Sequence, residues 1–374
     1  MTKCIDRIAA YRLRVPLRVP YRLAFGPVEY FDTIIVEVAD ADGRTGFGEA
    51  TILTGYTDET IDDSWRAARQ FAADLALADR ETGWREMRRL GVKLPFTATA
   101  FGTALEMLGG SEVLSLPAAA SVPLVGLLNA REEEAIHIEI GQLLAAGYRT
   151  LKVKLGFDAA KDAEMVKTVQ RVVQGRVRIR LDANQGYTAE QGMNFVKALD
   201  PADIELFEQP CAAGDWESHL AVARVSPVPM MLDESIYGLE DIEKAASLEA
   251  ADYIKVKLMK LVTLDALAKA IERIRELGMK PVLGNGVACD PGCWMEGCIA
   301  ARYLDNAGEM NGFLKARAPL LQGGLEFGNG AMIVKPGFSP RLDPASLDEY
   351  LIDSVTFGQR TVSGAAIGVG YAGR

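Results

Sequence analysis

Short apolar runs that each end in a polar residue recur along most of this chain, and this periodicity constrains the fold more than any other feature. Amphipathic segments with helical spacing, such as 159–174 and 264–277, separate several of the runs. Alternation of strands and helices favours a parallel sheet, and a series of eight strands favours a (β/α) barrel. The predicted strands are Val122–Val125, Thr150–Lys154, Val177–Asp182, Ile204–Glu208, Met230–Asp233, Tyr253–Lys257, Pro281–Gly284 and Gly308–Asn311.

The polar residues at the ends of these runs follow one another at intervals of 24 to 28 residues, which suits one strand–helix unit. In a parallel barrel the carboxyl ends of all strands surround one mouth, and barrel enzymes place their active sites there. We therefore expect side chains from distant parts of the chain to converge at this mouth. They are Lys154, Asp182, Glu208, Asp233, Lys257, Asn285 and Glu309.

The remainder of the 374-residue chain has a different pattern. The segments Ile34–Val38 and Gly46–Ala50 flank an acidic glycine turn and predict an antiparallel hairpin, and helical spacing follows over 58–78 and 80–89. We predict an α/β protein in three segments. These are an α+β domain over 1–120, the barrel over 121–323, and a C-terminal segment over 324–374 that returns to the first domain.

Charge and composition exclude several classes of function. A formal net charge of −10 would repel a nucleic-acid backbone, so we expect no nucleic-acid partner. No apolar run approaches the about 18 residues of a membrane span, and no signal-peptide core is evident, so we expect a cytoplasmic protein without membrane contact. The two histidines, His137 and His219, are too few for a multi-histidine metal site, which leaves acid–base chemistry to carboxylates and lysines.

Three of the converging residues are carboxylates, at the ends of successive predicted strands. Asp182, Glu208 and Asp233 would repel one another in a buried pocket unless a cation neutralised them. Three carboxylate oxygens leave open positions on an octahedral ion, which suits magnesium and somewhat less manganese. The alternative for any one of them alone is a cap of the following helix, as Asp233 could be.

Two of the converging residues are lysines that flank the carboxylates in strand order. Lys154 and Lys257 each belong to a Lys-x-Lys pair, and residues two apart on a strand share a face, so Lys152 can point inward with Lys154. An inward lysine near another cation and a metal should have a lowered pKa and act as a base. Two such lysines suit removal of the proton next to a carboxylate, because a metal stabilises the resulting enediolate. A Schiff-base aldolase that uses a barrel lysine as its nucleophile is the rival enzyme class.

These segments resemble the enolase superfamily. Within it they resemble the muconate-lactonising subgroup, also described as mandelate racemase/muconate cycloisomerase-like. The resemblance covers nearly the whole chain and is carried by Leu151–Gly156, Leu181–Gln185, Phe207–Pro210, Leu232–Ser235, Lys255–Lys257 and Gly46–Ala50. It implies a modified TIM barrel, (β/α)7β, with the α+β domain as its cap. It implies magnesium on Asp182, Glu208 and Asp233, with Lys154 and Lys257 as the acid–base pair. Lys152 would tune Lys154 and touch the substrate carboxylate, and Asn184 would support the metal site.

The resemblance also implies a small-molecule carboxylate substrate and an isomerase: a racemase, an epimerase or a cycloisomerase. A dehydratase acting on the same site is the alternative. Two cap loops, with Phe25 and Tyr56, would cover a substrate that also contacts Asn285 and Glu309. Dipeptide epimerases of the subgroup hold the substrate ammonium with an Asp-x-Asp pair, and this chain has Glu309-Met310-Asn311 at that place, which weakens the case for a dipeptide. We also expect a homo-oligomer.

Overall fold

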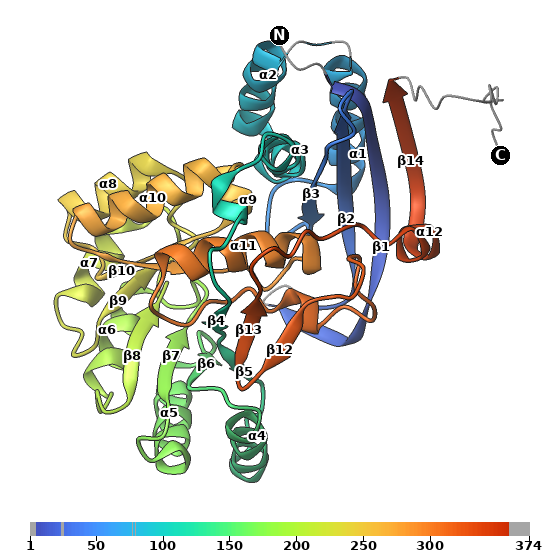
Figure 1. Cartoon of the computed structure of the whole chain (residues 1–374). Helices are drawn as coiled ribbons and strands as arrows, with labels where there is room; N and C mark the ends of the chain where they lie inside the picture. Colours follow the sequence, from blue (N-terminus) through green and yellow to red (C-terminus); the bar gives the residue numbers. More distant parts are fainter. Residues whose placement is uncertain (1–4, 24–25, 77, 79, 359–374) are drawn as a thin grey trace.

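The N-terminal part of the chain folds around an antiparallel sheet. The computed structural model describes residues 5–23, 26–76, 78 and 80–358. The sheet has the order β14-β1-β2-β3, formed by β1 (Ile5–Leu23), β2 (Gly26–Asp40), β3 (Thr45–Ile52) and β14 (Leu351–Gly358). The predicted hairpin is confirmed, with Ile34 opposite Ala50. The C-terminal segment does return to this domain, because β14 pairs with β1 (Figure 1).

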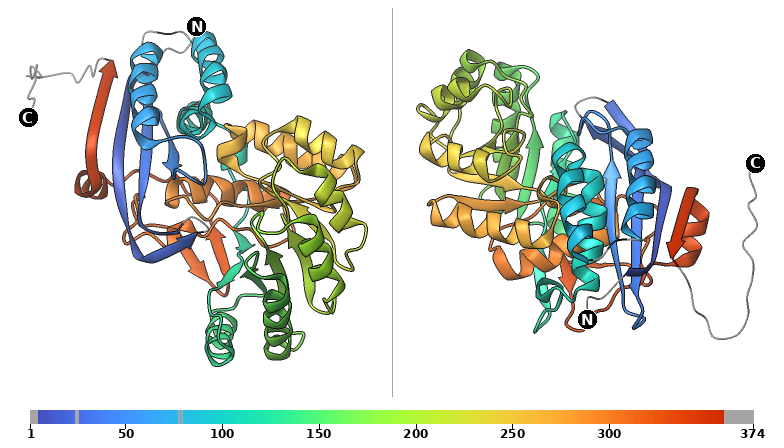
Figure 2. Two further views of the ribbon diagram at one scale, coloured as in Figure 1. Left: turned by 180° about the vertical axis from the view of Figure 1, so that it is seen from behind. Right: turned by 90° about the horizontal axis from the view of Figure 1, so that it is seen from above.

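Helices cover one face of this sheet. They are α1 (Ile61–Leu75), α2 (Arg80–Lys93) and α3 (Pro95–Leu108). Helix α1 begins after Thr60, whose side chain accepts a hydrogen bond from the Asp63 amide. Helix α3 lies directly on β3 because glycine leaves the space: a Cβ at Gly48 would lie 2.1 Å from the Ala100 carbonyl oxygen. Together the sheet and its helices form the cap (Figure 2).

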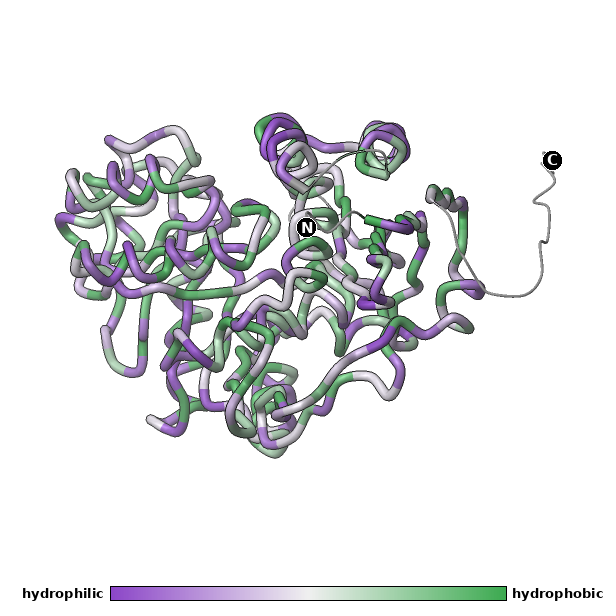
Figure 3. The backbone as a smooth tube through the Cα atoms, turned by 45° about the horizontal axis from the view of Figure 1, so that its top comes forward, coloured by the Kyte–Doolittle hydropathy of each residue, from purple (hydrophilic) through white to green (hydrophobic). Residues whose placement is uncertain are grey.

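The barrel contains seven hydrogen-bonded parallel strands in sequential order, with helices outside them (Figures 1 and 2). The strands are β5 (Gly126–Leu128), β6 (Thr150–Lys154), β7 (Arg178–Asp182), β8 (Ile204–Glu208), β9 (Met230–Leu232), β10 (Tyr253–Val256) and β11 (Lys280–Leu283). The helices are α4 (Glu133–Ala145), α5 (Ala159–Val173), α6 (Ala189–Lys197), α7 (Trp216–Ala223), α8 (Leu239–Ser247), α9 (Leu258–Leu261), α10 (Leu264–Glu276) and α11 (Asp290–Tyr303). Hydrophilic and hydrophobic residues alternate along the outer helices (Figure 3), as expected for helices with one buried face.

Six of the predicted strands are confirmed, and the first and last predictions are wrong. Residues 120–123 form β4 (Ala120–Pro123), which pairs with β13 (Ala331–Val334) outside the barrel, so the first barrel strand is β5. The predicted strand Gly308–Asn311 turns at once, because the Asn311 amide bonds back to the Glu309 carbonyl at 2.7 Å. Gly308 nevertheless bonds to Val125, and Glu309 bonds to Leu283, so this segment closes the gap between the first and last strands.

A few further elements connect the cap and the barrel. They are the short helices η1 (Glu112–Leu114), η2 (Gly312–Leu314) and α12 (Pro344–Tyr350), and the strand β12 (Glu326–Gly328), which pairs with β13. Glu49 of β3 joins the two parts directly, since its carboxylate accepts hydrogen bonds from the Cys289 and Gly292 amides at the start of α11. Among the described residues no helix is long and apolar enough to cross a bilayer. The predicted domain limits stay a prediction.

Candidate active site

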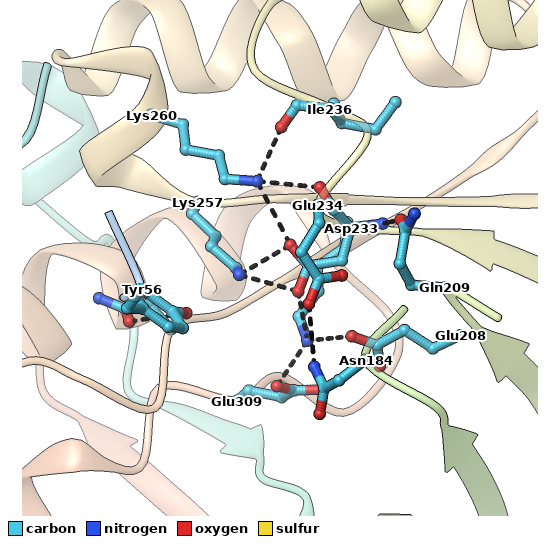
Figure 4. A network of polar contacts seen from close by, with 12 residues as sticks. Tyr56, Asn184, Glu208, Gln209, Asp233, Glu234, Ile236, Lys257, Lys260 and Glu309 are labelled. Carbon is cyan, nitrogen blue, oxygen red and sulfur yellow. Dashed lines mark hydrogen bonds and ion pairs between the residues drawn. The ribbon is translucent and has the colours of Figure 1, made fainter. Parts of the chain in front are cut away.

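The predicted site residues meet at the carboxyl ends of neighbouring barrel strands. Lys154, Asp182 and Glu208 are the last residues of β6, β7 and β8 and lie side by side in register. Asp233 and Lys257 directly follow β9 and β10. All three carboxylates are nearly or fully buried. The convergence that the spacing predicts is therefore present, and Figure 4 shows the part of the group that contains Glu208, Asp233 and Lys257.

Two inward lysines bridge the three carboxylates. The Lys152 Nζ lies 2.8 Å from Asp182 Oδ2 and 2.7 Å from Glu208 Oε2. The Lys255 Nζ lies 2.8 Å from Glu208 Oε1 and 3.4 Å from Asp233 Oδ2. Each ammonium group therefore lies close to two carboxylates on adjacent strand ends. Lys255 was recognised in the sequence only as part of a Lys-x-Lys pair.

Glu309 completes this network from the closing segment. Its two carboxylate oxygens accept hydrogen bonds from Lys152 at 2.9 Å and from Lys255 at 2.7 Å. Burial alone would raise its pKa, but the two lysines hold the pKa of Glu309 well below the usual range. Glu309 therefore anchors both inner lysines, and its predicted contact with the substrate stays a prediction.

The two proposed acid–base lysines lie on opposite flanks of the carboxylate row. Lys154 Nζ lies 2.5 Å from Asp182 Oδ2 and from Asn184 Oδ1, at one end of the row. Lys257 Nζ lies 2.7 Å from Asp233 Oδ1, at the other end. The Lys154 side chain is 35% exposed and that of Lys257 only 5%. The two flanks therefore differ in their access to water.

Charged neighbours and burial together set the pKa values of these groups. The pKa of Lys257 is raised well above its usual value, because Asp233 outweighs the opposing effect of burial. The sequence argument expects a lowered pKa for a lysine that lies beside both a second cation and a bound metal, and this expectation stays a prediction. Burial and the Asp182 charge raise the pKa of Glu208 to about 7, and lysine neighbours lower that of Asp182 to about 2 despite its burial.

The carboxylates suit a divalent cation in kind and position. Asp182, Glu208 and Asp233 supply the oxygen ligands that magnesium prefers, and they lie on adjacent strand ends. In the described part of the chain, however, no group of three or more acidic, histidine or cysteine side chains has the arrangement of a metal site. Lys152 and Lys255 each donate a hydrogen bond to one of the two Glu208 carboxylate oxygens.

The predicted cap residues reach this mouth in part. The Tyr56 ring lies over Lys257, with Nζ 4.7 Å from its centre, and its hydroxyl donates to Asn285 Oδ1 at 3.3 Å. Asn285 is also tied to Val287 by two hydrogen bonds, which orient its side chain. Phe25 lies outside the described residues.

Sequence reasoning missed two charged residues beside the carboxylates. Lys260, one turn after Lys257 in α9, donates to the Asp233 carbonyl at 2.9 Å, and burial lowers its pKa to about 8. Glu234 accepts a hydrogen bond from the Asn184 amide at 2.9 Å (Figure 4). The signal for Glu234 was its place directly after a strand-end carboxylate. Lys260 carried no periodic signal.

Comparison with known sequences finds consistent relatives. A family model described as "Enolase C-terminal domain-like" matches residues 135–346. The L-Lys-D/L-Arg epimerase of Methylococcus capsulatus is 30% identical over 358 residues, covering 86% of this chain and 94% of that protein. The o-succinylbenzoate synthase of Geobacillus stearothermophilus is 29% identical over 271 residues, covering 68% of this chain and 70% of that protein.

Solved structures with the same fold cover almost the whole chain. The N-succinyl Arg/Lys racemase of Bacillus cereus superposes with a TM-score of 0.86 at 21% identity, covering 95% of this chain and all of the other. The muconate lactonizing enzyme of Pseudomonas putida superposes with a TM-score of 0.81 at 21% identity, covering 93% and 99%. At such identities these similarities establish the fold alone.

Proposed function

Since the chain belongs to the enolase superfamily, we propose that it is a magnesium-dependent isomerase that removes the proton next to a substrate carboxylate. The observation that carries this proposal is the placement of Lys154 and Lys257 at opposite ends of a buried carboxylate row. A substrate carbon above that row would have a lysine on each side. A base and an acid on opposite faces are what inversion at that carbon requires.

Asp182, Glu208 and Asp233 would hold the magnesium ion. A bound ion would stabilise the negative charge that develops on the substrate carboxylate oxygens as the proton leaves. Five carboxylates and five ammonium groups form the network around this place: Asp182, Glu208, Asp233, Glu234, Glu309, Lys152, Lys154, Lys255, Lys257 and Lys260. A divalent cation would add two positive charges to this balanced set. Deprotonation of one lysine would remove one of them, and one substrate carboxylate would offset the other.

The other residues of the chain would orient and shield the reacting groups. Lys152 would contact the substrate carboxylate, since its Nζ already lies between two carboxylates of the row. Asn184 holds the Lys154 ammonium group through its oxygen and Glu234 through its amide nitrogen. Tyr56 covers Lys257 and would exclude water from that flank.

The net reaction that we favour is racemisation or epimerisation, because several of the similar proteins are named for it. Cycloisomerisation uses the same proton transfer and is kept within the proposal. A lyase is the second candidate, favoured by the similarity to o-succinylbenzoate synthase. A cytoplasmic location and a homo-oligomer stay predictions.

The proposal is tested by hydrogen exchange in deuterated buffer. A panel of small carboxylates is incubated with the protein and magnesium, and loss of the α-proton signal is followed by NMR. We expect exchange for at least one member, its loss on chelation, and its recovery when magnesium is restored. The exposed lysine variant Lys335→Met should behave like the unchanged protein. Exchange that persists in chelator, or that no panel member shows, would contradict the proposal.

A further inference from the structure

Lys315 lies beside the proposed site, on a segment fixed by the cap. It directly follows η2, and its carbonyl accepts a hydrogen bond from the Arg18 amide of β1 at 2.8 Å. The next residue but one, Arg317, donates from its amide to the Pro16 carbonyl at 2.8 Å. These two bonds hold the backbone of Lys315 against β1, so the position of its side chain is set by the cap.

The Lys315 ammonium group is directed toward the loops that follow the last barrel strands. Its Nζ donates to the Gly286 carbonyl at 2.6 Å and to Asn311 Oδ1 at 2.8 Å. It also lies 4.0 Å from the centre of the Tyr21 ring. Gly286 makes this approach possible, because a Cβ there would lie 2.9 Å from Nζ and 3.0 Å from the Tyr21 hydroxyl oxygen. The lysine and the tyrosine therefore converge over a glycine.

This pair faces the same mouth as the acid–base lysines. Burial would raise the pKa of Tyr21, but the charges of Lys315, Lys154 and Lys152 together lower it below its usual range. Tyr21 thus lies within electrostatic reach of the Lys154 flank. On the other side, Asn285 precedes Gly286 and accepts the Tyr56 hydroxyl. The pair therefore has neighbours on both flanks.

The partners of Lys315 differ in charge from those of the other lysines at this mouth. Each of those lysines has a carboxylate oxygen within 4.0 Å of its Nζ. The lysines are Lys152, Lys154, Lys255, Lys257 and Lys260. Within residues 5–23, 26–76, 78 and 80–358, Lys315 contacts neutral acceptors and a ring face. Among the described residues, Lys315 therefore differs from these five lysines in having no carboxylate in direct contact with its ammonium group.

We propose that Lys315, together with the Tyr21 hydroxyl, selects substrates that carry a second anionic group besides the reacting carboxylate. This inference rests on the proposed function for the identity of the reacting end. A second carboxylate would supply the missing negative charge and accept charge-assisted hydrogen bonds from both groups. The same arrangement disfavours a substrate ammonium, because the Asn311 oxygen is already occupied by the ammonium of Lys315.

A binding experiment without turnover tests this assignment. Calorimetry in magnesium buffer compares the dicarboxylates succinate, glutarate and adipate with the monocarboxylates of equal chain length, butyrate, valerate and hexanoate. We expect at least one dicarboxylate to bind about 10-fold to 100-fold more tightly than its partner, the usual strength of a hydrogen bond to a charged group. Lys315→Met should abolish that preference and leave monocarboxylate affinity unchanged.

Further variants separate a charge effect from a folding defect. Lys315→Arg should retain much of the preference, and Tyr21→Phe, which keeps the ring, should reduce it. Lys335→Met, a charge-matched exposed control, should retain all of it. Equal affinity for every matched pair, or a preference that survives in Lys315→Met, would overturn the assignment. Because no proton transfer is measured, these results are independent of hydrogen exchange, whose absence would count against the proposed function instead.

Discussion

Glu296 is a buried carboxyl group whose ionisation should limit stability at neutral pH. It lies on α11 with 1% of its surface exposed. One oxygen accepts a long hydrogen bond of 3.4 Å from the Leu258 amide, and the other has no partner among the described residues. Burial raises the pKa of Glu296 from 4.5 to about 8. The folded chain therefore retains a proton that the unfolded chain loses above pH 4.5, and stability should fall as pH rises toward 8.

The perturbation is Glu296→Gln, which keeps the shape and removes the ionisation. With its pKa at about 8, Glu296 should lower the free energy of unfolding by roughly 3 kcal/mol between pH 5 and pH 8, since each pKa unit is worth about 1.4 kcal/mol. Urea unfolding at both pH values measures the free energy of unfolding. We expect the variant to match the unchanged protein near pH 5 and to exceed it by about 2 to 4 kcal/mol at pH 8. The exposed control Glu272→Gln should show no such pH-dependent gain. An equal offset at both pH values would refute the reasoning.

Two other substitutions probe the metal site and the barrel. Glu208→Gln should weaken magnesium binding, measured by calorimetry. The loss should exceed the about 10-fold to 100-fold that is typical when a residue behind a metal ligand is removed. Unchanged affinity would show that Glu208 is not a ligand. Arg180 is fully buried and bonds to Glu205 and the Ala307 carbonyl, so Arg180→Met should lower the free energy of unfolding by about 3 kcal/mol in urea titrations. A change of less than about 0.5 kcal/mol, as at a surface position, would show that these contacts contribute little.

The strand ends could be predicted because the information is local. A polar residue after a buried apolar run marks the end of a strand, and regular spacing places successive ends side by side, as for Asp182 and Glu208. The Lys-x-Lys pattern likewise predicts that Lys152 and Lys154 share a face, and both do contact Asp182.

What the sequence did not reveal depended on partners far away in the chain. Val122 is apolar enough for a barrel strand, yet its pairing partner is Met332, which no local pattern reveals. Lys315 gains its setting from β1, some 300 residues earlier, through the Arg18 amide.

The most direct test of the account is hydrogen exchange resolved by enantiomer. A carboxylate that exchanges with the unchanged protein is supplied as each separate enantiomer to Lys154→Ala and Lys257→Ala. On the proposed function each lysine faces one side of the α-carbon, so each variant should lose exchange for one enantiomer, by about 100-fold to 10,000-fold, and retain it for the other, with opposite preferences. Magnesium affinity should persist in both. Loss of exchange for the same enantiomer in both variants would contradict a two-base site and favour one base with one electrostatic lysine, as in a lyase or a cycloisomerase.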